Sequence, residues 1–359
     1  MLSLELLARQ LVEREGSDLH IAAGSPPMMR IDGRLIPAGE EKLSAEATRK
    51  LVYGILNSEQ VERFEEELEL DMSFGIEGLG RFRTNVFMQR EAVGSVLRVI
   101  PQETIPFVQL GLPPQACERI CNLRKGLVLV TGATGSGKST TLSSMVDHIN
   151  ASRTEHIMTI EDPIEFIHQN KGCLVNQREV GSDTHGFQNA LRTALRQDPD
   201  VIMVGEIRDQ ETISAALTIA ETGHLTFATL HTNSVVQTVN RIVDVFPAHQ
   251  QSQVRTQLSF TLEAIFCQQL VPREGERGRV LAAEVLMATP AARALVREDK
   301  VHQLESVVQT GGRLGMRTMN QSLLQHCNDG QISFKNALRY SPTPDDIERM
   351  YKKSGGVCV

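Results

Sequence analysis

The chain has 359 residues, which is long enough for about two domains, each with its own core. Its formal charge of -7 argues against a general nucleic-acid-binding protein, because phosphate contacts need a basic face, and an aromatic content of 4% leaves few platforms for stacking bases. The 6 cysteines are scattered without a CxxC pair, which argues against a zinc site or a disulfide framework and favours reduced thiols.

The N-terminal segment predicts a helix that faces a protein core. Residues 2–12 are apolar but carry two charges, and they align Leu4, Leu7 and Leu11 on one helical stripe. A secretory signal would not show this pattern. No stretch of the sequence approaches the roughly twenty uninterrupted apolar residues of a membrane helix, so we expect no direct membrane span.

Residues 1–105 predict a first domain in which helices alternate with short strands. The strands are expected at Leu19–Ala22, Met28–Ile31, Asp71–Phe74, Arg81–Met88 and Gly94–Ile100. The acidic run at residues 65–69 is most simply a solvated helix surface, with a recognition patch as the alternative.

Arginines of the first domain are candidates for binding phosphate. A period of two places Arg81, Arg83 and Asn85 on one strand face, and Arg98 occupies a nearby strand. Transferred phosphoryl groups call for arginines, sometimes from a neighbouring subunit, so Arg83 and Arg98 could reach an adjacent nucleotide. The alternative is the solvated polar face of a half-buried strand.

The rest of the chain predicts an α/β domain. Residues 106–118 contain Pro106, Pro113 and Pro114 and predict a linker. Residues 119–340 alternate strand and helix patterns, which indicates a mostly parallel sheet with helices on both faces and a helical C-terminal part. The prolines and glycines of residues 341–359 predict a flexible tail.

A phosphate-binding loop is the most informative motif. The apolar run Leu127–Val130 is followed by a G-x-x-x-x-G-K-S segment and then by a helix pattern from Thr140. Glycines let the backbone wrap around phosphates, Lys138 neutralises the β/γ oxygens, and the Ser139 hydroxyl is suited to Mg²⁺. The predicted ATP site comprises Gly132, Ala133, Thr134, Gly135, Ser136, Gly137, Lys138, Ser139 and Thr140.

Carboxylates follow two further apolar strands of this domain. Glu161 and Glu165 come after residues 157–160, and Glu206 comes after residues 201–204. Parallel sheets bind ligands at the carboxyl ends of their strands, so Glu161 and Glu206, with Ser139, are candidates for the Mg²⁺ shell. Glu165 or Glu161 could orient the attacking water, whereas capping or pairing with an arginine is the structural alternative.

Two histidines flank the next predicted strand. His224 closes a helix pattern, and the strand at residues 225–230 leads to His231. At a strand end beside a phosphate site, His231 could sense the γ-phosphate. A single histidine is otherwise more often a hydrogen-bonded structural residue.

In order along the chain, these motifs resemble the Walker A, Asp box, Walker B and His box of the secretion ATPase superfamily. They lie at residues 132–140, 159–166, 205–209 and 221–232, and they are most similar to the PilT family of type IV pilus retraction ATPases. Residues 16–20 and 26–33 resemble the family's PAS-like N-terminal module. The family's AIRNLIRE-type motif, associated with retraction, appears at residues 291–298 in a less standard form that keeps both arginines.

The resemblance implies a RecA-like P-loop domain joined to a PAS-like domain, in a homohexamer that hydrolyses MgATP to disassemble a pilus and power twitching motility. It implies the catalytic carboxylate at Glu165, the Walker B acid at Glu206, and the His-box pair at His224 and His231. The implied partners are an inner-membrane pilus platform protein and other pilus machinery ATPases. The implied location is cytoplasmic, peripheral at the inner membrane.

Other functions remain open at this stage. A retraction-assisting paralogue shares the same motifs. Many extension and secretion ATPases carry a tetracysteine zinc insert, which this sequence lacks. A nucleic-acid translocase shares the ATPase core but conflicts with the negative charge. A nucleotide-gated scaffold would bind ATP without hydrolysing it.

Overall fold

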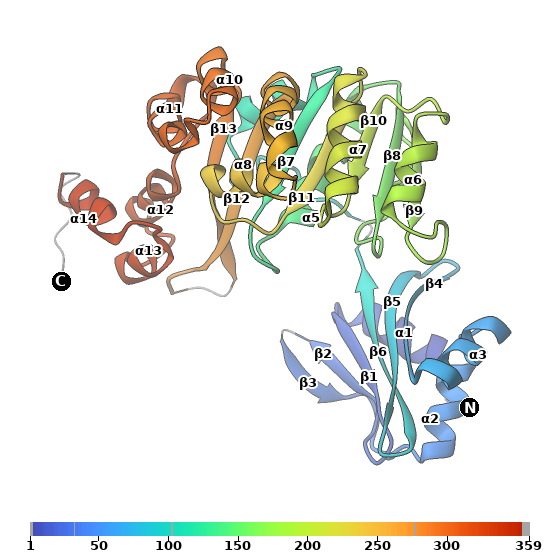
Figure 1. The fold of residues 1–359 in the computed structure, drawn as a ribbon. Helices are drawn as coiled ribbons and strands as arrows, with labels where there is room; N and C mark the ends of the chain where they lie inside the picture. The colour runs from blue at the N-terminus through green and yellow to red at the C-terminus, as the bar shows by residue number, and fades with distance from the viewer. Residues whose placement is uncertain (1–2, 32, 102, 276–277, 354–359) are drawn as a thin grey trace. The chain divides into compact units, whose positions relative to one another are not determined.

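The computed structural model describes residues 3–31, 33–101, 103–275 and 278–353. The chain forms two compact units (Figure 1). The first comprises Met1–Glu103 with Pro163–Ile167, and the second comprises Thr104–Asp162 with His168–Val359. Each unit has its own buried core. Among the described residues, no helix has the length and apolar character needed to cross a membrane.

The first unit is a six-stranded antiparallel sheet with helices. Its elements are α1 (Leu4–Glu13), β1 (Asp18–Ile21), β2 (Met28–Ile31), β3 (Arg34–Pro37), α2 (Ala45–Tyr53), α3 (Ser58–Glu67), β4 (Glu69–Ile76), β5 (Gly80–Gln89) and β6 (Ala92–Ile100). The strand order is β3-β2-β1-β6-β5-β4. The predicted strands all form, and the structure adds β3, an edge strand whose 4 residues are all exposed and therefore show no apolar alternation.

Alternating side chains build the core of this unit. In β5, Phe82 and Val86 are fully buried, whereas Arg81, Arg83 and Asn85 on the other face are partly exposed. The helices begin at capping residues, and α3 has a capping box in which Asn57 and Gln60 satisfy each other's backbone N–H groups. The predicted period of two in this strand is therefore confirmed.

The second unit is built on a seven-stranded sheet. Its elements up to the end of the sheet are α4 (Pro114–Cys121), β7 (Gly126–Thr131), α5 (Lys138–Ser152), β8 (His156–Glu161), β9 (Leu174–Glu179), α6 (Phe187–Ala194), β10 (Val201–Val204), α7 (Gln210–Glu221), β11 (Leu225–Leu230), α8 (Val235–Asp244), α9 (Ala248–Thr261), β12 (Leu262–Pro272) and β13 (Arg279–Met287). The strand order is β13-β12-β7-β11-β10-β8-β9. Only the pairing of β12 with β13 is antiparallel among the described strands of this sheet, so the predicted α/β class with a mostly parallel sheet is confirmed.

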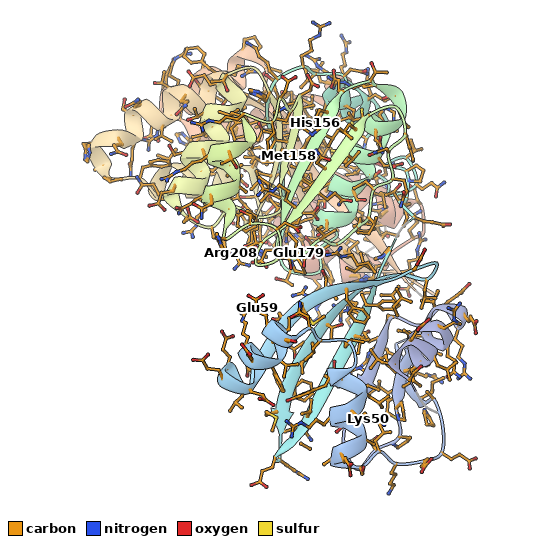
Figure 2. All side chains as sticks on the ribbon, turned by 90° about the vertical axis from the view of Figure 1, so that its right-hand side faces the viewer. Lys50, Glu59, His156, Met158, Glu179 and Arg208 are labelled. Atoms are coloured by element: carbon orange, nitrogen blue, oxygen red, sulfur yellow. The ribbon has the colours of Figure 1, made fainter. Side chains whose placement is uncertain are left out.

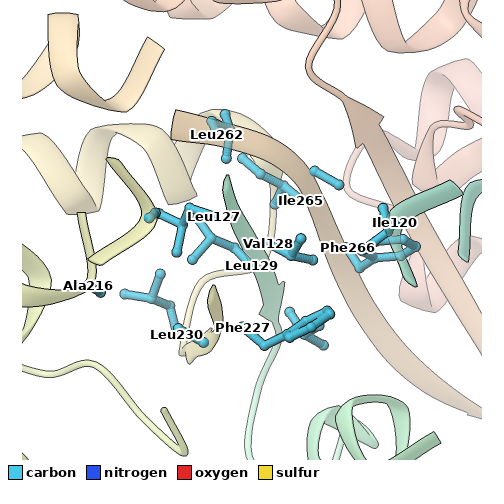
Figure 3. Close-up of a cluster of buried hydrophobic side chains, with 14 of the residues drawn as sticks. Ile120, Leu127, Val128, Leu129, Ala216, Phe227, Leu230, Leu262, Ile265 and Phe266 are labelled. Atoms are coloured by element: carbon cyan, nitrogen blue, oxygen red, sulfur yellow. The ribbon is translucent and has the colours of Figure 1, made fainter. Parts of the chain in front are cut away.

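The core of the second unit lies around β7. All six residues of β7 are buried, as expected for a central parallel strand covered on both faces. Figure 3 shows Leu127 and Leu129 packed among apolar side chains of neighbouring strands, including Phe227 and Phe266. This packing fixes the end of β7, from which the phosphate loop starts.

The prediction of a linker at residues 106–118 was wrong, because this segment packs into the core of the second unit. Phe107 and Leu112 are 4% and 2% exposed and belong to the core of the second unit. The prolines have a different role here, because Pro113 is the N-cap and Pro114 the first residue of α4. Proline is favoured at the first position of a helix, where its missing N–H costs nothing.

The predicted flexible tail was also wrong over much of its length. The α-helices after β13 are α10 (Pro290–Arg297), α11 (Leu304–Thr310), α12 (Met319–Asn328), α13 (Phe334–Tyr340) and α14 (Pro344–Lys353). In α14, Ile347 is fully buried and the ring of Tyr351 stacks on Phe334 at 4.1 Å. Acidic residues in its first turn and lysines in its last turn complement the helix dipole. The last part of the predicted tail, residues 354–359, lies outside the described residues.

A buried histidine beside α5 makes the stability of the second unit depend on pH. Burial lowers the pKa of His168 to about 4, with smaller contributions from Asp147 and Lys171. The folded protein holds the imidazole neutral, while the unfolded chain takes up a proton below its ordinary pKa of 6.5. The stability that His168 contributes is therefore present above pH 6.5 and is lost as the pH falls toward 4.

We expect the free energy of unfolding to fall between pH 7 and pH 5 by about 2 kcal/mol more in the wild type than in His168→Gln, which carries no titrating group. Urea unfolding at both pH values measures this difference. Equal losses in the two proteins would contradict a neutral, buried His168.

Candidate functional site

The phosphate loop connects β7 to α5. Gly132, Gly135 and Gly137 have φ angles of 146°, 76° and 91°, a region of backbone space that residues with a Cβ rarely adopt. The loop ends at the N-terminus of α5, where backbone N–H groups favour an anion. Lys138 is the first residue of α5, and its Nζ donates to the carbonyl oxygens of Gly132 and Ala133 at 2.9 and 3.1 Å. The ammonium is thus held against the loop that the sequence predicts to bind phosphate.

The first glycine of the loop has no room for a side chain. A Cβ at Gly132 would lie 2.5 Å from the carbonyl oxygen of Gln268 and 2.5 Å from Oγ of Ser136. At Gly135, where φ is also positive, a Cβ would meet no atom within 4 Å. An alanine would have a strained backbone at either position, but only at position 132 would its Cβ also clash with neighbouring atoms.

Gly132→Ala should weaken MgADP binding at least tenfold, because the loop must shift to relieve the clash, a cost of about 1.4 kcal/mol or more in binding free energy. Gly135→Ala is the matched control and should have the smaller effect. Titration of both variants with a fluorescent ADP analogue measures the affinities. Equal affinities would show that the close approach to Gln268 does not shape the loop.

Carboxylates lie at the same edge of the sheet as the loop. In the parallel ladder, Ile160 at the end of β8 pairs with Val204 of β10, and Leu230 of β11 pairs with Thr131 of β7. The segments that follow these strands therefore emerge together. Figure 2 shows Arg208 and Glu179 at the end toward which β8 runs from His156 past Met158.

Glu161 is buried within this edge and already engaged. Glu161 is only 6% exposed, and its Oε1 accepts hydrogen bonds from Thr159 Oγ1 at 2.7 Å and from Gln177 Nε2 at 3.3 Å. Two donors orient the carboxylate. The assignment of Glu161 to the Mg²⁺ shell stays a prediction.

Glu206 and His231 meet at this edge. His231 Nε2 lies 3.1 Å from Glu206 Oε1, and Arg208 Nη2 donates to Glu206 Oε2 at 2.8 Å. The hydrogen bond from Arg208 is the largest influence on the pKa of Glu206 and lowers it below its ordinary value. Together with smaller contributions from the charges of His231 and Arg208, it outweighs the opposite effect of partial burial. Glu206 is therefore a carboxylate over the physiological pH range, as a cation-binding group must be.

Arg208 was not assigned a role from the sequence, although it is the strongest partner of Glu206. The Glu-Ile-Arg spacing could have predicted this contact, because two side chains separated by one intervening residue in an extended segment lie on the same side.

The structure separates His224 from the loop. His224 precedes β11, and its backbone carbonyl accepts a hydrogen bond from Gly126 at the start of β7. The loop follows the other end of β7, so the length of a six-residue strand, about 20 Å, lies between them. Its Nδ1 instead lies 3.1 Å from the Ile219 carbonyl oxygen. His224 thus lies at the other end of β11 from the loop, and its assignment from the sequence as a nucleotide-binding residue stays a prediction.

Two of the candidate phosphate-binding arginines, Arg83 and Arg98, lie on neighbouring strands of the first unit. Arg98 Nε donates to Asp18 Oδ1 at 2.8 Å, and the register places Arg30, Asp18, Arg98 and Arg83 opposite one another in neighbouring strands. Burial alone would raise the pKa of Asp18, but hydrogen bonds from Ser17 and Arg98 outweigh it and hold the pKa low. Arg98 is thus partly committed to an ion pair.

Glu165 is exposed and lies in the Pro163–Ile167 segment, which belongs to the first unit. Its role in water activation stays a prediction, as do the roles of Arg83 and Arg98.

Ser139 and Glu206 are candidate magnesium-binding residues at this edge of the sheet. Among the described residues, no group of three or more His, Cys, Asp or Glu side chains could hold a metal ion. Ser139 and Glu206 offer oxygen atoms of the kind Mg²⁺ prefers. Mg²⁺ commonly binds one or two protein groups together with nucleotide phosphates and water, and these residues fit that arrangement.

Comparisons with known proteins agree with this geometry. The family model described as "Type II/IV secretion system protein" matches residues 7–339. The type IV pilus retraction ATPase PilT of Pseudomonas aeruginosa is 49% identical over 343 residues, which cover 96% of this chain and 99% of that protein. The type IV pilus ATPase PilU of the same organism is 44% identical over 351 residues, 98% of this chain and 92% of that protein.

A crystal structure of the pilus retraction motor PilT with bound ADP has a similar fold. The TM-score is 0.91 at 48% sequence identity, and the match covers 98% of this chain and 100% of that one.

Proposed function

Because the chain belongs to the Type II/IV secretion system protein family, we propose that it is a motor ATPase that hydrolyses MgATP to drive retraction of a type IV pilus. The observation that supports this most strongly is the convergence of the phosphate loop, Glu206 and His231 at one edge of the sheet. The 49% identity to a pilus retraction ATPase supports the choice of substrate and process.

The residues of the loop supply the binding chemistry. Lys138 and the N-terminus of α5 neutralise the β- and γ-phosphates, and the Ser139 hydroxyl with the Glu206 carboxylate holds Mg²⁺. The ion neutralises charge that develops on the phosphoryl oxygens. Glu165 orients and deprotonates the attacking water, which is the role its motif has in the family.

His231 connects this chemistry to the rest of the domain. Its Nε2 lies beside Glu206, and Thr229, two residues before it, donates a hydrogen bond to the Gly205 carbonyl oxygen. A change in charge at the γ-phosphate therefore reaches β11 through Glu206 and His231. This supports a sensing role for His231 in hydrolysis.

We further propose that the chain works as a cytoplasmic homohexamer at the inner membrane. Arg83 and Arg98 would complete the nucleotide site of a neighbouring subunit, since charge on a transferred phosphoryl group is commonly met by arginines in trans. The partners would be an inner-membrane platform protein of the pilus and other ATPases of the pilus machinery.

A second candidate is a paralogue that assists retraction. The observation that favours it is the 44% identity to PilU over 98% of the chain. Residues 291–298 bear on the same question. Arg293 in this segment donates to backbone carbonyls of Ser259 and Phe260 and pairs with Glu263 at 2.7 Å, so it anchors α10 to the end of α9.

Complementation separates the two candidates. The gene is expressed in a strain that lacks all of its own retraction ATPases, and twitching is measured beside the turnover of the purified protein. A retraction motor should restore twitching without help from another retraction ATPase. Turnover by the purified protein without restored twitching would favour the assisting paralogue, and no turnover with intact MgATP binding would favour a nucleotide-gated scaffold.

A further inference from the structure

Strand β12 supports the phosphate loop at Gln268. This residue is 1% exposed, and its neighbour Cys267 pairs with Thr131, the residue before the loop. The Gln268 carbonyl oxygen occupies the space that a side chain on Gly132 would need, at 2.5 Å from the Cβ position. The first glycine of the loop therefore packs directly on the backbone of β12.

The side chain of Gln268 holds the other end of the loop. Its Nε2 donates to Oγ1 of Thr141 at 2.7 Å, and Thr141 is 1% exposed in the first turn of α5. Thr141 follows Lys138 by three residues and so lies next to it on the helix. Gln268 thus contacts the start of the loop through its backbone and the helix that ends the loop through its amide.

Two buried polar atoms of this contact region have no hydrogen-bond partner among the described residues. They are Oε1 of Gln268, on the amide that bonds Thr141, and Oγ of Ser136, which lies 2.5 Å from the Cβ position at Gly132 and belongs to a residue only 5% exposed. Buried groups of this kind are rare because they lose their hydrogen bonds to water. Two such groups, one in the loop and one on the residue that supports it, mark the contact between β12 and the loop as a place where hydrogen bonding can change.

The same strand continues into the core beneath the C-terminal helices. Val271 of β12 and Val280 and Ala282 of β13 pack in one buried cluster with side chains of α12, α13 and α14. Members of the cluster on these helices are Met319, Leu323, Ala337 and Ile347. Because packed cores deform little, a shift of β12 at Gln268 is carried to these helices three residues further along the strand.

We propose that Gln268 is a positioning residue that couples the phosphate loop to the C-terminal helices. It sets the loop for nucleotide through Gly132 and Thr141, and β12 carries the loop's movement to α12, α13 and α14. This inference rests on the proposed ATPase function and adds a route by which nucleotide acts on the C-terminal part of the same unit.

The test compares Gln268→Leu, Thr141→Val and the double variant in the full chain. Affinity is measured with fluorescent ADP and Mg²⁺, and amide hydrogen exchange of residues 319–347 is measured with and without MgADP. Gln257→Leu is the control, because that glutamine lies in α9 and donates to Glu221 of α7, so the change removes a glutamine side-chain hydrogen bond that does not involve the loop or α5. Thr141→Val removes only one hydroxyl and keeps the test available if Gln268→Leu folds poorly.

We expect Gln268→Leu to weaken MgADP binding about tenfold, or about 1.4 kcal/mol, and to abolish the nucleotide-dependent change in exchange at residues 319–347. Thr141→Val should have the same effects in weaker form, and the double variant should be no worse than Gln268→Leu, since both changes break one contact. Wild-type affinity and exchange in both single variants, or a lowered melting temperature alone, would overturn the inference. Wild-type protein that binds no MgADP would instead refute the proposed function.

Discussion

Lys138→Ala should lose ATP hydrolysis by a factor of about 10² to 10³ or more, because the ammonium provides charge that the β- and γ-phosphates meet in the transition state. The expected effect is large because Lys138 is fixed against the loop by the carbonyl oxygens of Gly132 and Ala133. Lys138 is the only basic residue in the loop sequence at residues 132–140, so no other loop residue can supply this charge. A coupled-enzyme assay measures the loss of turnover, and titration with a fluorescent nucleotide measures any accompanying loss of binding affinity.

The control for this change is Lys171→Ala. Lys171 is exposed and pairs at 2.7 Å with Asp147, which lies in the C-terminal part of α5, whereas the loop precedes the N-terminus of that helix. It should leave turnover within about twofold of wild type, since exposed ion pairs contribute little. Equal losses in both variants would mean that the lysines act through stability and not through phosphate.

Glu165→Gln should lower kcat by about 10² to 10⁴ while MgATP affinity stays near that of the wild type. A glutamine fills the same space and still forms hydrogen bonds, but it cannot accept the proton of the attacking water. Because only the chemical step is affected, the loss should appear in kcat and not in the dissociation constant.

Glu161→Gln distinguishes the two carboxylates that the sequence left open. Glu161 already accepts hydrogen bonds from Thr159 and Gln177, so an amide there disturbs a buried network and should lower stability as well as turnover. A smaller fall in kcat than that of Glu165→Gln is expected. The reverse order, with Glu161→Gln inactive and Glu165→Gln near wild type, would move water activation to Glu161.

Much of the nucleotide site could be predicted from the sequence because its signals are local. The loop carries its glycines, lysine and serine within eight residues, and Glu206 directly follows an apolar strand. Parallel strands then bring such ends together without further information. The contact between Glu206 and His231 follows from that rule.

The remaining features depend on relations that the sequence does not display. His224 and His231 belong to one sequence box, yet they lie at opposite ends of β11. Gln268 is one of several polar residues in the mostly apolar strand β12, and its partner Thr141 is 127 residues away. The prolines and glycines near the C-terminus suggested a tail, whereas the burial of Ile347 and the stacking of Tyr351 fix α14 in place. Composition reports local preference, and tertiary packing overrides it.

The retraction speed of single, fluorescently labelled pili tests the central proposal most directly. The host lacks its own retraction ATPases and carries either the wild-type chain or Glu165→Gln at matched expression. Our account predicts that pili shorten in cells with the wild-type chain and stay extended in cells with Glu165→Gln. Shortening at equal speed in both strains, or in neither while the purified wild type hydrolyses ATP, would contradict the proposal that hydrolysis by this chain pulls the pilus in.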